Sequence, residues 1–173
     1  MSKLEFPKEF PQLETKRLVL REIADSDSGA LFQNYSDDDI AKNFLDAPLT
    51  DIKQAIQFID AFRAEFSQGE AITWAISLKG TNEFIGTCSV MIESNSCAEI
   101  GYDLSKAHWG EGLMSEALNA IINYGFNELG LQKIKADTLS DNIRSINLLK
   151  RIGFQLDDVR EKSHFFSMQN QNE

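Results

Sequence analysis

The stretch Ile100-Gly-Tyr-Asp-Leu-Ser-Lys-Ala-His-Trp-Gly-Glu-Gly-Leu-Met-Ser-Glu-Ala-Leu118 carries the most information about this chain. Its pattern predicts an apolar strand, then a loop with two glycines, Gly110 and Gly112, and then a long helix. Glycine lets the backbone approach a ligand closely, and the first turn of a helix presents N–H groups without internal partners. Both features favour an anion, so the stretch predicts a seat for a phosphate or pyrophosphate group.

Other readings of the loop are a tight turn without a ligand or one of two nucleotide-binding motifs. A phosphate-binding P-loop would need a Lys-Ser or Lys-Thr pair after the second glycine, where Leu113 and Met114 stand. A dinucleotide fingerprint would need a third glycine at the position of Ser115. The residues exclude both nucleotide motifs and leave the tight turn open.

A second strand-to-helix passage lies downstream, where Lys133–Leu139 predicts a strand followed by Asp141, Asn142 and a further helix. Together the two passages resemble the cofactor half of the GNAT N-acetyltransferases, most closely the RimJ/RimL-like branch that acetylates the N-termini of ribosomal proteins. The resemblance covers nearly the whole chain. It is carried by Leu13-Glu-Thr-Lys-Arg-Leu-Val-Leu-Arg21, Glu99-Ile-Gly-Tyr102, His108-Trp-Gly-Glu-Gly112, Ser115-Glu-Ala117, Asn142-x-x-Ser145 and Gly153-Phe154.

The resemblance implies acetyl-coenzyme A as co-substrate and no metal. The pyrophosphate would accept hydrogen bonds from N–H groups of the loop and the helix start, and Lys106 and Arg144 would offset its remaining charge. One departure from the family is Ala107, where relatives usually carry Gln or Arg. The residues expected to hold the pyrophosphate are Trp109, Gly110, Glu111, Gly112, Leu113 and Met114.

The same resemblance implies that the strand Ala98–Leu104 bulges and splays away from the strand Lys133–Leu139. Backbone groups near Tyr102 and Leu104 would then pair with the pantetheine arm and polarise the thioester carbonyl. The alternative is a plain central strand.

An amine is mostly protonated at neutral pH, so the reaction needs a proton acceptor. The resemblance places Glu99 where several relatives carry a catalytic carboxylate, and Asp103 lies on the same strand face because side chains alternate. Both carboxylates could equally be solvated or structural charges.

Many relatives place a proton-donating tyrosine four residues before the Gly-Phe pair, but this chain has Leu149 there, which we assign to the apolar core. In this branch Asn142 and Ser145 are candidates to bind the cofactor or to act near its sulfur. A helix N-cap with a first-turn serine is the alternative, and both roles can hold together.

Length and composition favour one soluble domain spanning residues 1–173. The chain is 42% hydrophobic and 25% charged, which is ordinary for a globular protein. Its apolar runs fall far short of the ~20 residues that span a membrane, and its start lacks the apolar core of a signal peptide. We therefore expect a cytoplasmic protein that does not bind membranes.

The charge and the cysteines narrow the function further. A net charge of −10 argues against nucleic-acid binding and is compatible with a cationic substrate. Cys88 and Cys97 match neither a disulfide framework nor zinc-ligand spacing, so we expect reduced, structural thiols.

The hydrophobic periodicity predicts the order βααβββαβαββ, an α/β fold with a mixed sheet and helices on both faces. We expect Asp25 or Asp27 to cap the first helix, Thr50 to cap the second, and Asp37-Asp-Asp39 to form a loop or a further cap. The predicted strands are 16–22, 71–79, 83–93, 97–104, 133–139, 154–160 and 164–168, and the predicted helices end near 35, 68, 129 and 153.

These observations predict an acyltransferase that moves an acetyl group to a primary amine by direct attack, since no cysteine lies where a covalent intermediate needs one. The first acceptor candidate is a protein α-amino group, and the second is a small amine such as a polyamine or an aminoglycoside. A non-catalytic module that binds acyl-coenzyme A stays open, as does a homodimer. The short loop Glu161-Lys-Ser163 predicts an open acceptor site.

Overall fold

The computed structural model describes residues 4–171; residues 1–3 and 172–173, which the single-domain prediction included, lie outside the described part. It contains an eight-stranded mixed sheet in the order β1-β2-β3-β4-β5-β6-β8-β7. All neighbours are antiparallel except β5 and β6, which confirms the predicted sheet. The strands are β1 (Leu13–Glu14), β2 (Leu18–Glu22), β3 (Ala71–Leu78), β4 (Phe84–Ile92), β5 (Cys97–Leu104), β6 (Lys133–Leu139), β7 (Gln155–Arg160) and β8 (Ser163–Gln169).

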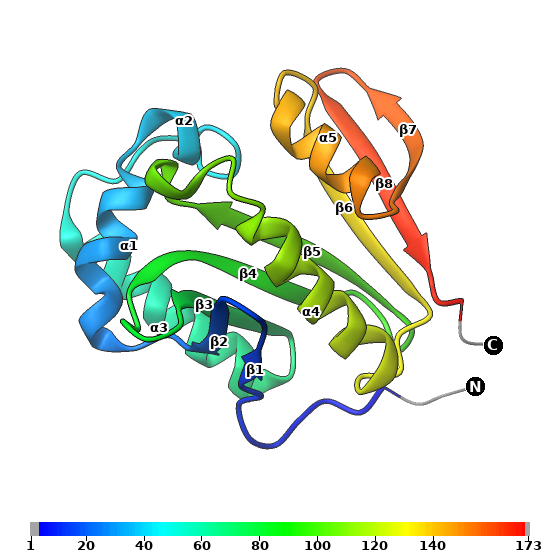
Figure 1. The fold of residues 1–173 in the computed structure, drawn as a ribbon, viewed down its shortest axis with the longest axis horizontal. Helices are drawn as coiled ribbons and strands as arrows, with labels where there is room; N and C mark the ends of the chain where they lie inside the picture. The colour runs from blue at the N-terminus through cyan, green and yellow to red at the C-terminus, as the bar shows by residue number, and fades with distance from the viewer. Residues whose placement is uncertain (1–3, 172–173) are drawn as a thin grey trace.

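Helices cover both faces of the sheet, as predicted (Figure 1). Buried side chains of α4 and α5 join one hydrophobic cluster with Trp74, Ile100 and Ile134 of the sheet. Those of α1 and α3 join a second cluster on the other face, with Ala75 and Phe84. The helices are α1 (Ser28–Tyr35), α2 (Asp38–Ala41), α3 (Ile52–Gln68), α4 (Leu113–Asn127) and α5 (Ile143–Arg151), with 3₁₀ turns η1 (Asp25–Asp27) and η2 (Lys106–His108).

The structure differs from the prediction at several element boundaries and helix caps. β1 pairs with β2 and is an additional strand, and β2 begins at Leu18 rather than at residue 16. Asp37 caps α2, a helix that was predicted only as a loop or a cap. Asp51, not Thr50, caps α3: its carboxylate accepts from the N–H of Lys53 at 2.9 Å.

The pair β5–β6 opens like a fork. Its register contains only Cys97↔Lys133, Ala98↔Ile134 and Glu99↔Lys135. Beyond Glu99 the two strands diverge, while β5 stays paired with β4 and β6 with β8 (Figure 1). The predicted splay is confirmed, and it leaves one edge of each strand without a strand partner.

The predicted bulge in β5 is wrong, since the register between β4 and β5 runs unbroken from Gly86↔Leu104 to Ile92↔Ala98. Gly86 explains the regular pairing. A Cβ at this position would lie 2.2 Å from the carbonyl oxygen of Asp103, so only glycine lets β4 follow β5 this closely. The register between β6 and β8 is equally unbroken, so the splay is a divergence of two regular strand pairs.

Candidate active site

A cleft with a cavity volume of about 1160 Å³ lies in the fork between β5 and β6. It is as large as the pockets that bind small molecules and cofactors. The starts of α4 and α5 and the segment around α2 complete its walls. Glu111 is absent from its lining, which includes the other predicted site residues: Glu99, Tyr102, Leu104, Trp109, Gly110, Gly112, Leu113, Met114, Asn142 and Ser145.

The glycine loop leaves the start of α4 open. Gly110 and Gly112 have φ angles of 81° and 76°, in the left-handed region that favours glycine. Gly112 is the N-cap of α4, and no side chain caps the first-turn N–H groups. Glu111 turns outward, with its carboxylate 3.3 Å from Nδ1 of His108. The loop thus offers backbone donors to an anion in the cleft.

Trp109 connects this loop to β5 and to α5. Its indole N–H donates to the carbonyl of Leu104 at 2.8 Å, and the guanidinium of Arg144 lies 3.3 Å from its ring centroid. Cation–π stacking of this kind adds to the stability of the contact. The carbonyl of Leu104 therefore already has one hydrogen-bond donor.

The cations near the loop differ from the prediction. Lys106 pairs with Asp37 and Asp39 at 2.9 and 2.6 Å and does not line the cleft. Arg144 does line it, and so does Arg151, which donates to Ser115 Oγ at 3.0 Å and which the sequence analysis missed. Lys150 and Arg151 are adjacent basic residues in the last turn of α5, and this pattern in the sequence could have indicated Arg151 as a candidate.

Two carboxyl groups meet at the vertex of the fork. Glu99 belongs to the last β5–β6 pair, and Asp137 of β6, also missed by the sequence analysis, hydrogen-bonds to it. Burial and this hydrogen bond raise the pKa of Glu99 to about 7. Lys135 is held by Glu93 at 2.8 Å. Glu99 can therefore exchange a proton near neutral pH.

The opposite face of β5 presents Tyr102 toward α5. Its hydroxyl lies 2.5 Å from Ser145 Oγ, and burial raises the pKa of Tyr102 to about 12. The N–H of Ser145 donates to Asn142 Oδ1 at 3.2 Å, so the predicted N-cap is present. Leu149 is fully buried, as predicted. These contacts connect a neutral phenol, a hydroxyl and a capped helix start on one wall of the cleft.

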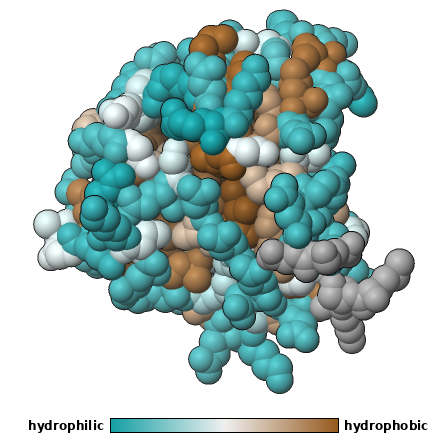
Figure 2. All heavy atoms as spheres, turned by 45° about the vertical axis from the view of Figure 1, so that its right-hand side comes forward, coloured by the Kyte–Doolittle hydropathy of each residue, from teal (hydrophilic) through white to brown (hydrophobic). Residues whose placement is uncertain are grey.

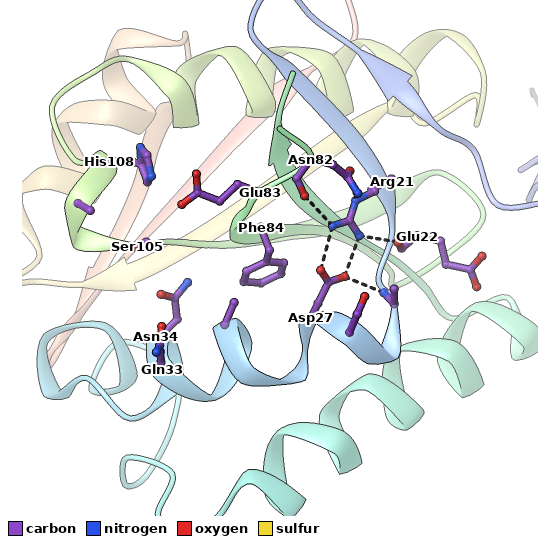
Figure 3. Close-up of a pocket in the computed structure, with 14 residues that line it drawn as sticks. Arg21, Glu22, Asp27, Gln33, Asn34, Asn82, Glu83, Phe84, Ser105 and His108 are labelled. Atoms are coloured by element: carbon purple, nitrogen blue, oxygen red, sulfur yellow. Dashed lines mark hydrogen bonds and ion pairs between the residues drawn. The ribbon is translucent and has the colours of Figure 1, made fainter. Parts of the chain in front are cut away.

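A smaller hollow of about 540 Å³ lies beside η2, and His108 lines both hollows (Figure 3). Figure 3 shows Arg21 and Asp27 facing each other in it, with guanidinium–carboxylate contacts of 2.7 and 2.9 Å. Arg21 also donates to Asn82 at 2.9 Å. This ion pair fastens the start of α1 to β2.

Apolar side chains are exposed near the middle of one face of the molecule, between mostly hydrophilic regions (Figure 2). Within residues 4–171, no helix is long and apolar enough to cross a membrane. The same range contains no group of three or more His, Cys, Asp or Glu side chains arranged to hold a metal ion. Cys88 and Cys97 are free thiols, as predicted, and neither lines the cleft.

Comparison with known proteins gives consistent matches. The family model of the acetyltransferase (GNAT) domain matches residues 17–155. The N-acetyltransferase YoaA of Bacillus subtilis is 38% identical over 152 residues, which cover 87% of this chain and 86% of YoaA. The ribosomal protein uS5-alanine N-acetyltransferase of Escherichia coli is 29% identical over 157 residues, covering 83% of this chain and 78% of that enzyme.

Solved structures share the fold. An acetyltransferase of the GNAT family from Bacillus anthracis aligns with a TM-score of 0.82 at 20% identity, covering 92% of this chain and 98% of that one. RimL, a ribosomal L7/L12 α-N-protein acetyltransferase solved with coenzyme A, aligns with a TM-score of 0.79 at 22% identity, covering 90% and 95%.

Proposed function

Since the chain belongs to the GNAT acetyltransferase family and is an acyltransferase, we propose that it moves the acetyl group of acetyl-coenzyme A to a primary amine by direct attack. The observation that carries this proposal is the fork between β5 and β6, with the uncapped start of α4 at its mouth. The fork offers unpaired strand edges to an extended amide-bearing arm, and the helix start offers donors to a pyrophosphate. RimL was solved with coenzyme A, which supports this choice of co-substrate.

The cofactor is proposed to lie along the predicted residues. N–H groups of the loop 109–114 would hold the pyrophosphate, and Arg144 and Arg151 would offset its charge. Backbone groups of Tyr102 would pair with the pantetheine arm inside the fork. Lys106 is excluded from this role because Asp37 and Asp39 already neutralise it.

Glu99 is proposed as the proton acceptor. With a pKa of about 7 it is substantially ionised at neutral pH, and its conjugate acid is weak enough to retain the proton that the amine releases. As the amine nitrogen attacks, the carbon–sulfur bond of the thioester breaks and the amine proton passes to Glu99, directly or through a water molecule.

Ser145 is proposed to stabilise the departing thiolate by donating a hydrogen bond from its hydroxyl group. Tyr102, which stays protonated because its pKa is about 12, can hydrogen-bond to the Ser145 oxygen from the other side. Asn142 orients Ser145 through the cap. A thiolate leaves readily at neutral pH because its pKa is ~8.5, so this assistance is modest.

A protein α-amino group is the first acceptor candidate. The uS5-alanine and ribosomal-protein-serine N-acetyltransferases of Escherichia coli act on proteins, and both are similar to this chain. A small polyamine or aminoglycoside is the second candidate, favoured by the tight turn at Glu161–Lys162, which places no long lid between β7 and β8.

An acceptor panel with free-thiol detection tests the proposal. Wild-type protein is incubated with acetyl-coenzyme A and, in turn, Ala- and Ser-initiated peptides, spermidine and an aminoglycoside. Amine-dependent thiol release is expected with at least one acceptor class. Binding of acetyl-coenzyme A without release from any acceptor would identify a non-catalytic module and contradict the proposal.

A further inference from the structure

Asp103 is a buried carboxylate with half of its hydrogen-bonding capacity unused. It is 8% exposed and lines the cleft. Its Oδ2 accepts a short hydrogen bond from the Thr87 hydroxyl and one of 3.2 Å from the Tyr35 hydroxyl. Its Oδ1 is shielded from solvent and has no hydrogen-bond partner among residues 4–171.

This arrangement is costly in the free protein. Burial raises the pKa of Asp103 to about 6, against the lowering effect of Thr87 and Tyr35, so the group is largely ionised at neutral pH. A buried, ionised oxygen without a donor is unfavourable, and native proteins usually satisfy such atoms. The remaining oxygen therefore calls for a donor, most effectively one with a positive charge, from a molecule that enters the cleft.

The surroundings supply no cation for this role. Along β5, the preceding side chains on the same face as Asp103 belong to Gly101 and Glu99. On the neighbouring strand β4, Thr87 and Ser89 lie opposite Asp103 and Gly101. The basic groups that line the cleft on α5, Arg144 and Arg151, are engaged with Trp109 and Ser115. Two further basic residues of the lining, Lys42 and His108, lie 3.5 Å from Asp39 and 3.3 Å from Glu111. Each basic residue of the lining thus already contacts another residue.

The position along β5 is suited to the acceptor rather than to the cofactor. Asp103 follows Tyr102 directly and points to the opposite face, so it lies across the strand from the Tyr102–Ser145 pair. A nucleophile on this side would approach the thioester from the face opposite the group that donates a hydrogen bond to the departing thiolate. A carboxylate is also a poor neighbour for the phosphates of the cofactor.

From these observations we infer that Asp103 is the anchor of the acceptor: a rotation of its carboxyl group turns the unpartnered Oδ1 toward the cleft, where it accepts a hydrogen bond from the ammonium form of the substrate's primary amine, while Tyr35 and Thr87 hold its other oxygen. The inference deepens the proposed acetyl transfer and rests on it. Asp103 is then a specificity-determining residue, which selects cationic amines over neutral nucleophiles such as alcohols.

The anchor and the proton acceptor are separate groups. Four residues of extended strand separate the Cα atoms of Glu99 and Asp103 by about 13 Å. An amine nitrogen held by the Asp103 carboxylate therefore lies too far from the Glu99 carboxylate for direct proton transfer. The proton that leaves the anchored amine reaches Glu99 through water. Loss of the anchor should therefore weaken binding of the amine, whereas loss of Glu99 should slow turnover.

Asp103→Asn tests the anchor. The asparagine oxygen can still accept from Tyr35 and Thr87, which turns its NH₂ group toward the amine. We expect KM for an amine acceptor, measured with the best acceptor of the panel, to rise at least tenfold. The Kd for acetyl-coenzyme A should change less than twofold, and the melting temperature should not fall, because replacement of a buried charge is often neutral or stabilising.

Thr87→Val is the companion variant. It removes one of the two donors to Oδ2 but keeps the charged carboxylate, so KM for the amine should rise less than it does in Asp103→Asn. If Asp103 served only to bond Thr87 and Tyr35, Asp103→Asn, which keeps both bonds, would leave KM unchanged and Thr87→Val would raise it more. Should Asp103→Asn fold poorly, the double variant with Tyr35→Phe, which removes one hydroxyl from the buried group, is measured in its place.

The outcomes separate the two proposals. Wild-type turnover with an unchanged KM in Asp103→Asn overturns the anchor and leaves acetyl transfer intact. A wild-type protein that neither acetylates nor binds any amine of the panel overturns both. As a direct check, calorimetry on the complex with coenzyme A should detect binding of an Ala- or Ser-initiated peptide of the panel. It should detect no binding of the same peptide when its α-amino group is acetylated.

Discussion

The two ends of the cleft are built from different chemical groups. The proposed cofactor end, residues 108–115 with Asn142–Ser145, offers mainly backbone N–H groups, left-handed glycines and a helix start. The proposed acceptor end, which comprises Tyr35, Thr87, Glu99, Asp103 and Asp137, offers carboxyl groups in partly or fully buried surroundings. Backbone geometry at the first end tolerates side-chain changes that keep the main chain, whereas at the second end a single proton changes the chemistry.

Removal of the proposed base is expected to have the largest effect and to act on the acceptor end alone. Glu99→Gln keeps the shape of the side chain and should lower kcat by ~10²-fold or more. Calorimetric affinity for acetyl-coenzyme A should remain close to that of wild type. Wild-type turnover of this variant at pH 7 would exclude Glu99 as the base.

A change at the cofactor end should show the reverse pattern. Gly112→Val places a β-branched residue at a φ of 76°, where only Arg17 lies near the new Cβ, so strain rather than a clash distorts the loop. We expect acetyl-coenzyme A to bind at least tenfold more weakly, by calorimetry.

Gly80→Val is the matched control for this change. Gly80 also has a positive φ, of 89°, with open space around it, but it lies in the β3–β4 turn outside the cleft. It should cost similar stability and leave the affinity unchanged. Equal losses of affinity in both variants would show that strain alone, and not the loop's contact with the cofactor, explains the effect.

The carboxyl pair at the fork vertex predicts a shift in pH dependence. Asp137→Asn removes a negative charge and a hydrogen bond that raise the pKa of Glu99, whereas the effect of burial remains. Since the ionised form of Glu99 is the active one, the acidic limb of the kcat/KM profile should move from about pH 7 to lower pH, and the variant should be relatively more active at pH 6.

Lys135→Met should move the same limb the other way. Lys135 lowers the pKa of Glu99 and also neutralises Glu93, so its loss adds negative charge near the base. Profiles of both variants that coincide with wild type would mean that a group other than Glu99 titrates in the reaction.

The smallest expected effect concerns the cap of α5. Asn142→Ala should destabilise the free protein by ~1 kcal/mol, which corresponds to a fall of about 2–4 °C in melting temperature for a chain of this size. If Asn142 also contacts the cofactor, the upward shift caused by acetyl-coenzyme A should shrink, because that shift follows the affinity.

Asp51→Ala, which removes the cap of α3 away from the cleft, should lower the baseline and keep the full ligand shift. A full ligand shift in Asn142→Ala as well would leave Asn142 with the cap role only.

The sequence was most informative where local structure depends on neighbouring residues. The loop 108–112, the cap Asn142–Ser145 and the buried Leu149 could all be predicted, because each depends on contacts within a few positions along the chain. Lys106 was misjudged, since its partners Asp37 and Asp39 lie almost seventy residues away. The bulge in β5 was also wrong: β5 pairs with β4 in an unbroken register, and this close approach depends on Gly86 of the neighbouring strand.

By itself, the sequence determined the family, the alternation of strands and helices and the glycine loop, because hydrophobic period and local backbone demands are written into consecutive residues. Only the tertiary structure decided which charges meet: Asp137 with Glu99 at the vertex of the fork, and Tyr35 and Thr87 with Asp103. These groups come from strands and helices far apart in the chain. Their protonation depends on burial and on through-space contacts, which exist only once the sheet has assembled.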